Sequence, residues 1–245
     1  MIGSTMLMEA CGLTDAGCVR KNNEDTFRLH PECGLYVIAD GMGGAQAGEH
    51  ASRLATDSVA GFVTARTASG AEPLSLLEDA FVHANHSVLG AARSDGSLEG
   101  MGTTLLAAMV SGSDLFIASV GDSRAYGLRP ASRLQLLTQD QSWVNEIGRL
   151  QLGLDEDALR RHPLRHVLTM AVGVGETLRV NSYAYPLEPG LQILLCSDGL
   201  HGVISEEEIE RVLRNSLSLD DKCAELIRLA KSAGGPDNIT VVVLK

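Results

Sequence analysis

Four aspartates lie where apolar stretches of this sequence meet turns. Asp40 follows the run LYVIA and precedes three glycines within four residues, Asp122 and Asp198 closely follow the runs FIASV and QILLC, and Asp237 precedes ITVVVL. Runs that are apolar on both faces suit strands covered on both sides. A single Asp-Gly pair is more often a hairpin turn, but four such acids favour a shared site. We expect strands of suitable direction to bring all four carboxylates to one edge of a core.

Carboxylates gathered in this way repel one another unless cations lie between them. Because the predicted site lacks cysteine and is poor in histidine, Mg²⁺ or Mn²⁺ fits it better than zinc. Two such ions roughly 4 Å apart can activate a water for attack on the phosphorus of a phosphate ester. Arg20, close in sequence to Asp25, offers a planar two-pronged donor for a phosphoryl group.

Other phosphatase and nucleotide chemistries lack their signatures here. No cysteine is followed by an arginine six residues later, and the acids at 155–157 are followed by Ala158 and Leu159 instead of a hydroxyl residue. Neither G-x-x-x-x-G-K-[ST] nor G-x-S-x-G occurs in the sequence. The sequence therefore favours metal-assisted hydrolysis without a protein nucleophile.

Two histidine pairs have spacings that resemble metal ligands. His83 and His86 lie one turn apart on an expected helix with no third ligand nearby, and Pro163 stands between His162 and His166. We interpret all four as structural or surface residues.

Composition limits the class of protein and its partners. The net charge of -11 would repel the phosphate backbone of DNA or RNA, so we do not expect a nucleic acid as partner. A content of 44% hydrophobic residues suffices for one sizeable core, so we expect a single domain over 1–245. Five cysteines without C-x-x-C argue against disulfides and zinc, and favour a cytoplasmic protein. The N-terminus lacks signal-peptide features, and the longest apolar stretch, 105–120, is interrupted by SGSD, so no membrane segment is expected.

Helical and strand periodicities alternate along the chain. Apolar spacings of three and four predict helices at 46–66 and 73–93, and two more beginning at Ser205, in a capping box with Glu208, and near Asp220. Buried strands are expected at 35–40, 103–110, 114–120, 191–196 and 239–245, with an irregular or edge strand in the polar segment 11–29. A short helical insertion is expected within 139–170. These elements indicate an α+β layered domain with two packed sheets.

Six motifs in order carry a family resemblance. They are R-x-x-N-E-D at 20–25, ADGMGG at 39–44, MGTT at 101–104, GDSR at 121–124, SDGL at 197–200 and DNIT at 237–240. The sequence resembles the metal-dependent, type 2C serine/threonine protein phosphatases of the bacterial branch, and the resemblance covers almost the whole chain. It implies a four-layer αββα sandwich, with two antiparallel β-sheets flanked by helix pairs and a binuclear Mn²⁺ or Mg²⁺ centre at one end.

The resemblance implies roles for the residues at the two principal metal ions. Asp40 would bridge both ions, the Gly41 carbonyl would bind one, and Asp198 and Asp237 would complete the other. Arg20 would bind the substrate phosphate, so Arg20, Asp40 and Asp198 are the expected catalytic residues.

Further residues would support this centre. Glu24 and Asp25 would act largely through metal-bound waters, Asp122 would help Asp198 to hold a third, weaker ion, and Asn238 would support the site.

The resemblance also marks a variable segment and three departures. The segment 142–168 would form a flap beside the cleft that bears on substrate choice. Met42 stands where animal members carry a histidine proposed as general acid, so the proton donor stays unassigned. Ala45 and Gln141 replace histidines often found in the family, and we expect them to affect the cleft rim more than catalysis.

The expected function is hydrolysis of phosphoserine and phosphothreonine on proteins, opposing a bacterial serine/threonine kinase. A role in secretion-system regulation would leave the same sequence features, and a monomer is expected. One alternative is a non-catalytic binding domain of the same fold, which would be expected to lose aspartates that this chain keeps. Another is a phosphatase of a different phosphorylated regulator, which shares all of this chemistry.

Overall fold

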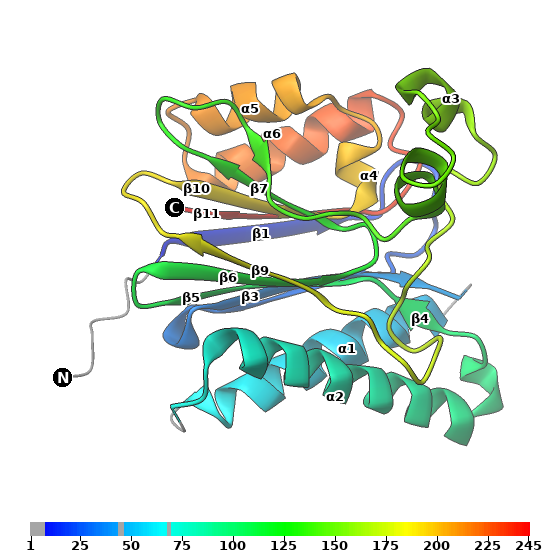
Figure 1. Ribbon diagram of the computed structural model, residues 1–245. Coiled ribbons are helices and arrows are strands. Elements are labelled where there is room, and N and C mark those ends of the chain that lie inside the picture. The colour runs from blue at the N-terminus through cyan, green and yellow to red at the C-terminus, as the bar shows by residue number, and fades with distance from the viewer. Residues whose placement is uncertain (1–7, 44–46, 68–69) are drawn as a thin grey trace.

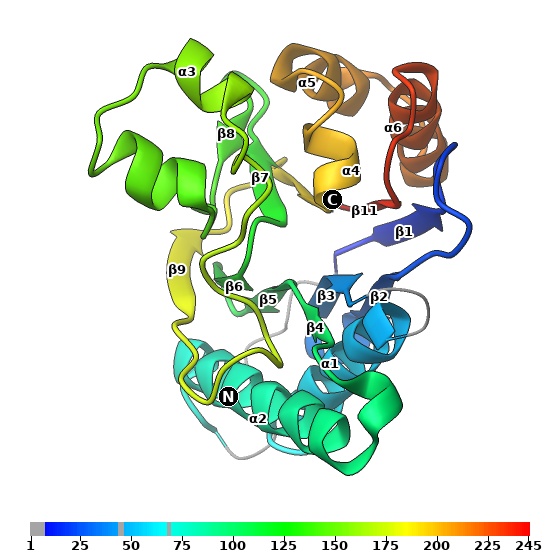
Figure 2. The ribbon, with the colours of Figure 1, turned by 90° about the vertical axis from the view of Figure 1, so that its right-hand side faces the viewer.

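Two antiparallel sheets face each other, and helices cover the outer face of each (Figures 1 and 2). The computed structural model describes residues 8–43, 47–67 and 70–245. Sheet on sheet with helices outside is the predicted αββα sandwich, so the α+β class is confirmed.

The first sheet lies under the C-terminal helices. Its strand order is β1-β11-β10-β7-β8. The strands are β1 (Ala10–Asp15), β7 (Arg124–Leu128), β8 (Gln135–Leu136), β10 (Gln192–Cys196) and β11 (Ile239–Leu244). The helices on this side are α4 (Asp198–His201), α5 (Glu206–Arg214) and α6 (Leu219–Ser232).

The second sheet lies on the two long N-terminal helices. Its order is β2-β3-β5-β6-β9, and β4 pairs with the end of β3. The strands are β2 (Asp25–His30), β3 (Leu35–Met42), β4 (Gly102–Thr103), β5 (Leu105–Ser111), β6 (Asp114–Val120) and β9 (Asn181–Pro186). The helices are α1 (Ala47–Thr64) and α2 (Pro73–Ser94), with short 3-10 helices at Pro31–Cys33 and Gly96–Leu98.

Alternation along the strands explains why the apolar runs are uninterrupted. On β3, Tyr36 and Ile38 enter the core between the sheets, whereas Val37 and Ala39 enter the core beneath α1 and α2. On β11, Val242 faces the same inter-sheet core, while its neighbours pack under α5 and α6. Both faces of each central strand are therefore buried, as the patterns predicted.

Two predicted strands differ from the structure. The segment 11–29 holds two edge strands, β1 and β2, which lie in different sheets. β3 does not end at Asp40, because Gly41 and Met42 continue it by pairing with Thr103 and Gly102 of β4. The glycine-rich segment after Asp40, which the sequence predicts as a turn, thus begins as an extended strand because β4 pairs with it.

The helix predictions hold with small shifts at the ends. α5 begins with the predicted capping box, in which Ser205 and Glu208 exchange both hydrogen bonds. α6 begins after the cap Ser218, slightly before the predicted start near Asp220. Residues 44–46, which include Ala45 and the predicted start of the first helix, lie outside the described residues.

The segment 142–168 forms a helical excursion beside the sandwich. It contains a π-helical turn at Val144–Arg149 and the short helix α3 (Glu156–Arg161). An isolated bridge between Ser142 and Leu168 closes its base.

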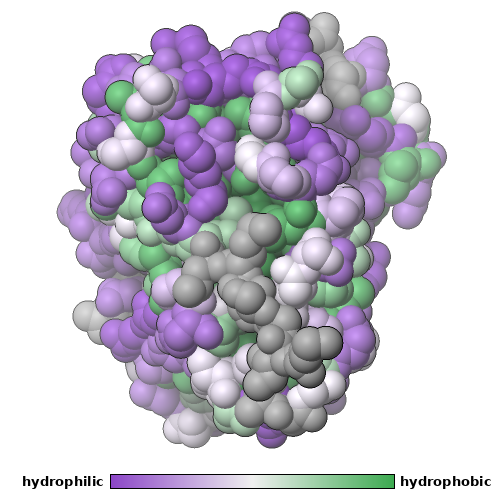
Figure 3. Space-filling view, turned by 90° about the vertical axis from the view of Figure 1, so that its left-hand side faces the viewer, coloured by the Kyte–Doolittle hydropathy of each residue, from purple (hydrophilic) through white to green (hydrophobic). Residues whose placement is uncertain are grey.

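The exterior is mixed in polarity. On the end of the sandwich seen in Figure 3, hydrophilic residues dominate the upper part, on the side where α5 and α6 lie, and hydrophobic residues show nearer the middle. Within the described ranges, none of the helices combines the length and apolar composition needed to cross a bilayer.

Candidate functional site

Five aspartates from both sheets come together at one end of the sandwich. Asp25 begins β2 and is the register partner of Asp40 on β3. Asp198 begins α4 after β10, Asp237 lies two residues before β11, and Asp122 lies in the turn between β6 and β7. These element ends lie toward the right of Figure 1 and face the viewer in Figure 2. The structure therefore brings together the four acids at the ends of apolar runs and Asp25, which the motif at 20–25 indicated.

The backbone of Asp40 is held on both sides by the MGTT segment. Its N–H donates to Thr104 Oγ1 at 2.9 Å, and its carbonyl accepts the Thr104 N–H at 2.8 Å and the Thr103 hydroxyl at 2.9 Å. Thr104 Oγ1 also lies 2.8 Å from Ser123 Oγ. These two threonines thus fix Asp40 and link it to the turn that carries Asp122.

Asp25 is buried and only partly satisfied. Ser197 Oγ donates to Asp25 Oδ2 at 2.8 Å and accepts the Thr240 N–H at 2.9 Å. Within the described part of the chain, the buried Oδ1 atoms of Asp25 and Asp198 have no hydrogen-bond partner. Buried carboxylate oxygens are seldom left unpaired, so these two are positions where a cation fits.

Arg20 lies at the exposed margin of the acids. Its Nη2 contacts Asp237 Oδ2 at 2.8 Å, with the two side chains 57% and 36% exposed. The hydrogen bond with Asp237 and the charge of that residue raise the pKa of Arg20, and the charges of Glu24 and Asp40 add weakly to this. The predicted phosphate-binding side chain therefore rests on a predicted metal ligand.

Asn238 ties the loop before β2 to the start of β11. Its Oδ1 accepts the Glu24 N–H at 2.8 Å, and its Nδ2 donates to the carbonyls of Ala16 and Asn22 at 3.1 and 2.9 Å. The Gly41 N–H in turn donates to the Glu24 carbonyl at 3.1 Å. Asn238 therefore fixes the backbone of this loop.

The turn that carries Asp122 is secured by Gln141. The Gly121 N–H donates to Gln141 Oε1 at 3.0 Å, and the Gln141 N–H donates to the Gly121 carbonyl at 2.8 Å. Gln141 Nε2 also donates to the Arg179 carbonyl at 2.8 Å, and the residue is 1% exposed. The side chain of Gln141 is thus buried and holds the backbone of Gly121 and Arg179, so it supports the turn of Asp122 instead of lying at the cleft rim as expected.

Two charged or polar residues behind Asp122 were not predicted. His201 Nε2 donates to the Asp122 carbonyl at 3.0 Å, and burial, reinforced by the Arg124 charge, lowers the pKa of His201 to about 4. Arg124 contacts Asp140 through both Nε and Nη2, the latter at 2.7 Å. The partner of His201 is 79 residues away, so no local spacing could have indicated it.

The acids shift one another's protonation. Burial, with the charge of Asp198 as the leading acidic neighbour, raises the pKa of Asp25 to about 7 and that of Asp122 to about 8. Burial and the surrounding carboxylates, Asp25 foremost, raise the pKa of Asp40 well above its ordinary value. Burial and then Asp237 raise the pKa of Asp198. These four can be ionised together near neutral pH only if positive charge compensates them.

The helical segment 142–168 lies next to the acids. The rings of Trp143 and His162 stack with centroids 4.1 Å apart. His166 is one of the groups whose charge lowers the pKa of Asp198, against the effect of burial. The excursion therefore borders the acidic end of the sandwich.

The donor set fits Mg²⁺ or Mn²⁺. It consists of carboxylate and backbone oxygens, and two carboxylate oxygens lack partners. Among the residues described, no three acidic, histidine or cysteine side chains already form a metal-ligand cluster. Mg²⁺ usually keeps several of its waters and binds one or two carboxylates directly, so coordination here would be completed by water.

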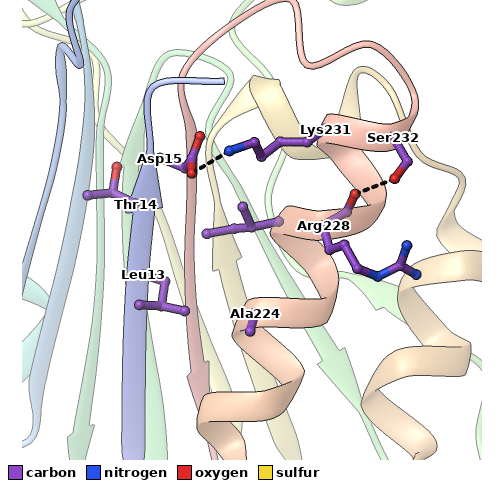
Figure 4. Close-up of a pocket in the computed structure, with 8 residues that line it drawn as sticks. Leu13, Thr14, Asp15, Ala224, Arg228, Lys231 and Ser232 are labelled. Atoms are coloured by element: carbon purple, nitrogen blue, oxygen red, sulfur yellow. Dashed lines mark hydrogen bonds and ion pairs between the residues drawn. The ribbon is translucent and has the colours of Figure 1, made fainter. Parts of the chain in front are cut away.

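A cavity of about 550 Å³ lies elsewhere, between β1 and α6 (Figure 4). Leu13 and Ile227 contribute apolar surface, and Asp15 pairs with Lys231 across it at 2.9 Å. None of the five clustered aspartates lines this cavity. It is therefore separate from the acidic site.

Comparison with known proteins identifies relatives over almost the whole chain. The family model of protein phosphatase 2C matches residues 19–238. The serine/threonine phosphatase stp of Listeria welshimeri is 37% identical over 237 residues, which cover 95% of this chain and 93% of that protein.

Solved structures agree with this relationship. The catalytic domain of the serine/threonine protein phosphatase PstP, in complex with two manganese ions, has a TM-score of 0.85 and 33% identity over 97% of each chain. PppA, described as a key regulatory component of the type VI secretion system (T6SS) in Pseudomonas aeruginosa, has a TM-score of 0.82 and 32% identity over 98% of each chain.

Proposed function

Because the chain belongs to the protein phosphatase 2C family, we propose that it hydrolyses phosphoserine and phosphothreonine on proteins with Mn²⁺ or Mg²⁺ as cofactor. The observation that carries this proposal is the cluster of five aspartates with two unpaired buried carboxylate oxygens. Such a cluster costs stability unless cations bind. A silent binding domain of the same fold would have no use for it, so the catalytic reading is favoured.

We assign the principal metal ligands by motif and placement. Asp40, whose backbone is fixed by Thr104, would lie between two ions, and the Gly41 carbonyl would bind one of them. Asp198 and Asp237 would complete the other. When bound, the ions supply the Lewis acidity that activates a water for attack on phosphorus.

The remaining acids would act one step further out. Glu24 and Asp25 would orient water at the ions, because Ser197 holds the Asp25 carboxyl and Asn238 holds the backbone of Glu24. Asp122 and Asp198 would share a third, weaker ion.

Arg20 would grip the phosphoryl group. Its guanidinium is more than half exposed and can reach substrate, and its planar donors match phosphate oxygens. The new bond joins the water oxygen to phosphorus, and the bond to the serine or threonine oxygen breaks. In the net reaction the attacking water supplies one proton to that oxygen, which leaves as a hydroxyl, and its other proton stays with the phosphate. Met42 carries no proton to give, so it is not the acid for this step.

The partners follow from the reaction and from the relatives. We propose phosphorylated proteins as substrates and a bacterial serine/threonine kinase as the enzyme that phosphorylates them. The phosphatase itself would act in the cytoplasm as a monomer. The likeness to PppA supports a secretion system as one setting for this activity.

The test is hydrolysis of a phosphothreonine peptide by the purified protein, with Mn²⁺ or with EDTA. We expect activity only with the metal, and a loss of several orders of magnitude in Asp198→Asn with the fold retained. Full activity in that variant would remove the binuclear assignment. A folded wild-type protein that is inactive with Mn²⁺ and Mg²⁺ would instead support a binding role.

A further inference from the structure

The short helix α4 carries an acid at its first residue and an imidazole at its last. Asp198 opens the helix, and the Gly202 N–H donates to the Asp198 carbonyl at 2.8 Å. Gly199 lies so close to the start of β11 that an added Cβ would be 1.9 Å from the Asn238 carbonyl oxygen. Together with the fully buried Leu200, this contact packs α4 closely against the start of β11.

His201 extends from this fixed helix to the turn that carries Asp122. Its Nε2 lies 3.0 Å from the Asp122 carbonyl oxygen. A carbonyl can only accept, so Nε2 bears the proton and donates. The bond therefore connects the residue three places after Asp198 to the backbone of Asp122.

The rest of the turn is held from the other side. Gln141 pairs with both backbone groups of Gly121, and Ser123 contacts Thr104. These bonds secure the residues before and after Asp122, whereas His201 secures Asp122 itself. The hydrogen bond from His201 thus joins the backbone of Asp122 to the helix that begins at Asp198.

We propose that His201 is a positioning residue that fixes Asp122 relative to Asp198 and so determines how tightly these two carboxylates hold a divalent cation. The inference rests on the proposed function, because it assigns Asp122 and Asp198 to the third ion. Hydrogen-bond partners behind metal ligands typically change metal affinity about 10- to 100-fold when they are removed. His201 would not touch the substrate and would act only through Asp122.

The experiment is a Mn²⁺ titration of the metal-stripped protein, in which electron paramagnetic resonance measures the free ion. The variants are His201→Leu, which removes the donor, and His201→Gln, whose amide nitrogen can replace Nε2. Asp122→Asn serves as the reference for loss of the carboxylate. Wild-type protein should bind two ions tightly and a third weakly.

We expect His201→Leu to weaken the third ion at least about tenfold, as Asp122→Asn does, and His201→Gln to stay within about threefold of wild type. Unchanged affinities in His201→Leu, or equal losses in the Leu and Gln variants, would overturn the inference. If the Leu variant does not fold, His201→Asn, whose amide is too short to reach, takes its place under the same criteria.

The outcomes also separate this inference from the proposed function. If Asp122→Asn leaves all Mn²⁺ affinities unchanged while wild-type protein hydrolyses phosphothreonine with Mn²⁺, the His201 inference fails and the phosphatase stands. A wild-type protein without metal-dependent hydrolysis fails the proposed function, whatever the titration shows.

Discussion

Replacing Ser197 with alanine should destabilise the protein strongly, although the change removes one oxygen. Ser197 Oγ is buried, donates to Asp25 Oδ2 and accepts the Thr240 N–H. A hydrogen bond to a charged group contributes about 1.5–3 kcal/mol, and a buried N–H left unpaired costs about 1–3 kcal/mol. We therefore expect Ser197→Ala to lower the free energy of unfolding by about 3–5 kcal/mol.

The assay is urea unfolding at pH 8 in EDTA, followed by circular dichroism. A matched control is Ser87→Ala on α2, whose exposed hydroxyl donates to the His83 carbonyl of the same helix. That change should alter stability by no more than about 0.5 kcal/mol. If Ser197→Ala costs less than about 1 kcal/mol, the buried link between Asp25 and β11 does not hold the site as described.

Three further predictions concern pH, packing and substrate binding. Burial raises the pKa of Asp25 to about 7 and that of Asp122 to about 8, from an ordinary value of 3.8. Between pH 4 and 8 the folded, metal-free protein therefore binds more protons than the unfolded chain. Its stability in EDTA should therefore fall as the pH rises from 4 to 8, and urea midpoints that are equal or higher at pH 8 than at pH 5 would contradict this. Gly199→Ala should lower the melting temperature by about 5–10 °C, because its Cβ would meet a backbone carbonyl at 1.9 Å, whereas Gly90→Ala, with open space around it, should not lower it. Arg20→Ala should raise the KM for a phosphopeptide at least about tenfold with a smaller effect on kcat, and an unchanged KM would refute its role as the phosphate grip.

Local patterns in the sequence predict most of the elements, because a strand buried on both faces is recognisable without its partners. The helix ends and the capping box at Ser205 are equally local. The pairing of strands is not local. The continuation of β3 past Asp40 and the division of 11–29 between two sheets therefore depend on segments far away in the chain. Asp40 therefore lies inside β3, and not at the end of a strand as the sequence pattern predicts.

The same contrast applies to the site. Aspartates beside glycines are visible in the sequence, and the structure gathers them at one end. The residues that hold them, such as Ser197 and His201, are invisible there, since each contacts an acid 172 or 79 residues away. Hydrogen bonds over such separations leave no periodic trace. The roles of individual acids at the metal ions stay predictions until metal binding is measured.

The pairing of β1 with β11 has a consequence for biosynthesis. Thr14 and Thr240 are register partners 226 residues apart, and β11 lies between β1 and β10 in its sheet. A ribosome must therefore release residues 239–244 before β1 can find its neighbour, and Asp237 arrives with the same segment. Contacts of this kind make folding slow. Until β11 has left the ribosome, the nascent chain carries an unfinished sheet and an incomplete acidic centre, so the proposed phosphatase activity begins only after translation has passed β11.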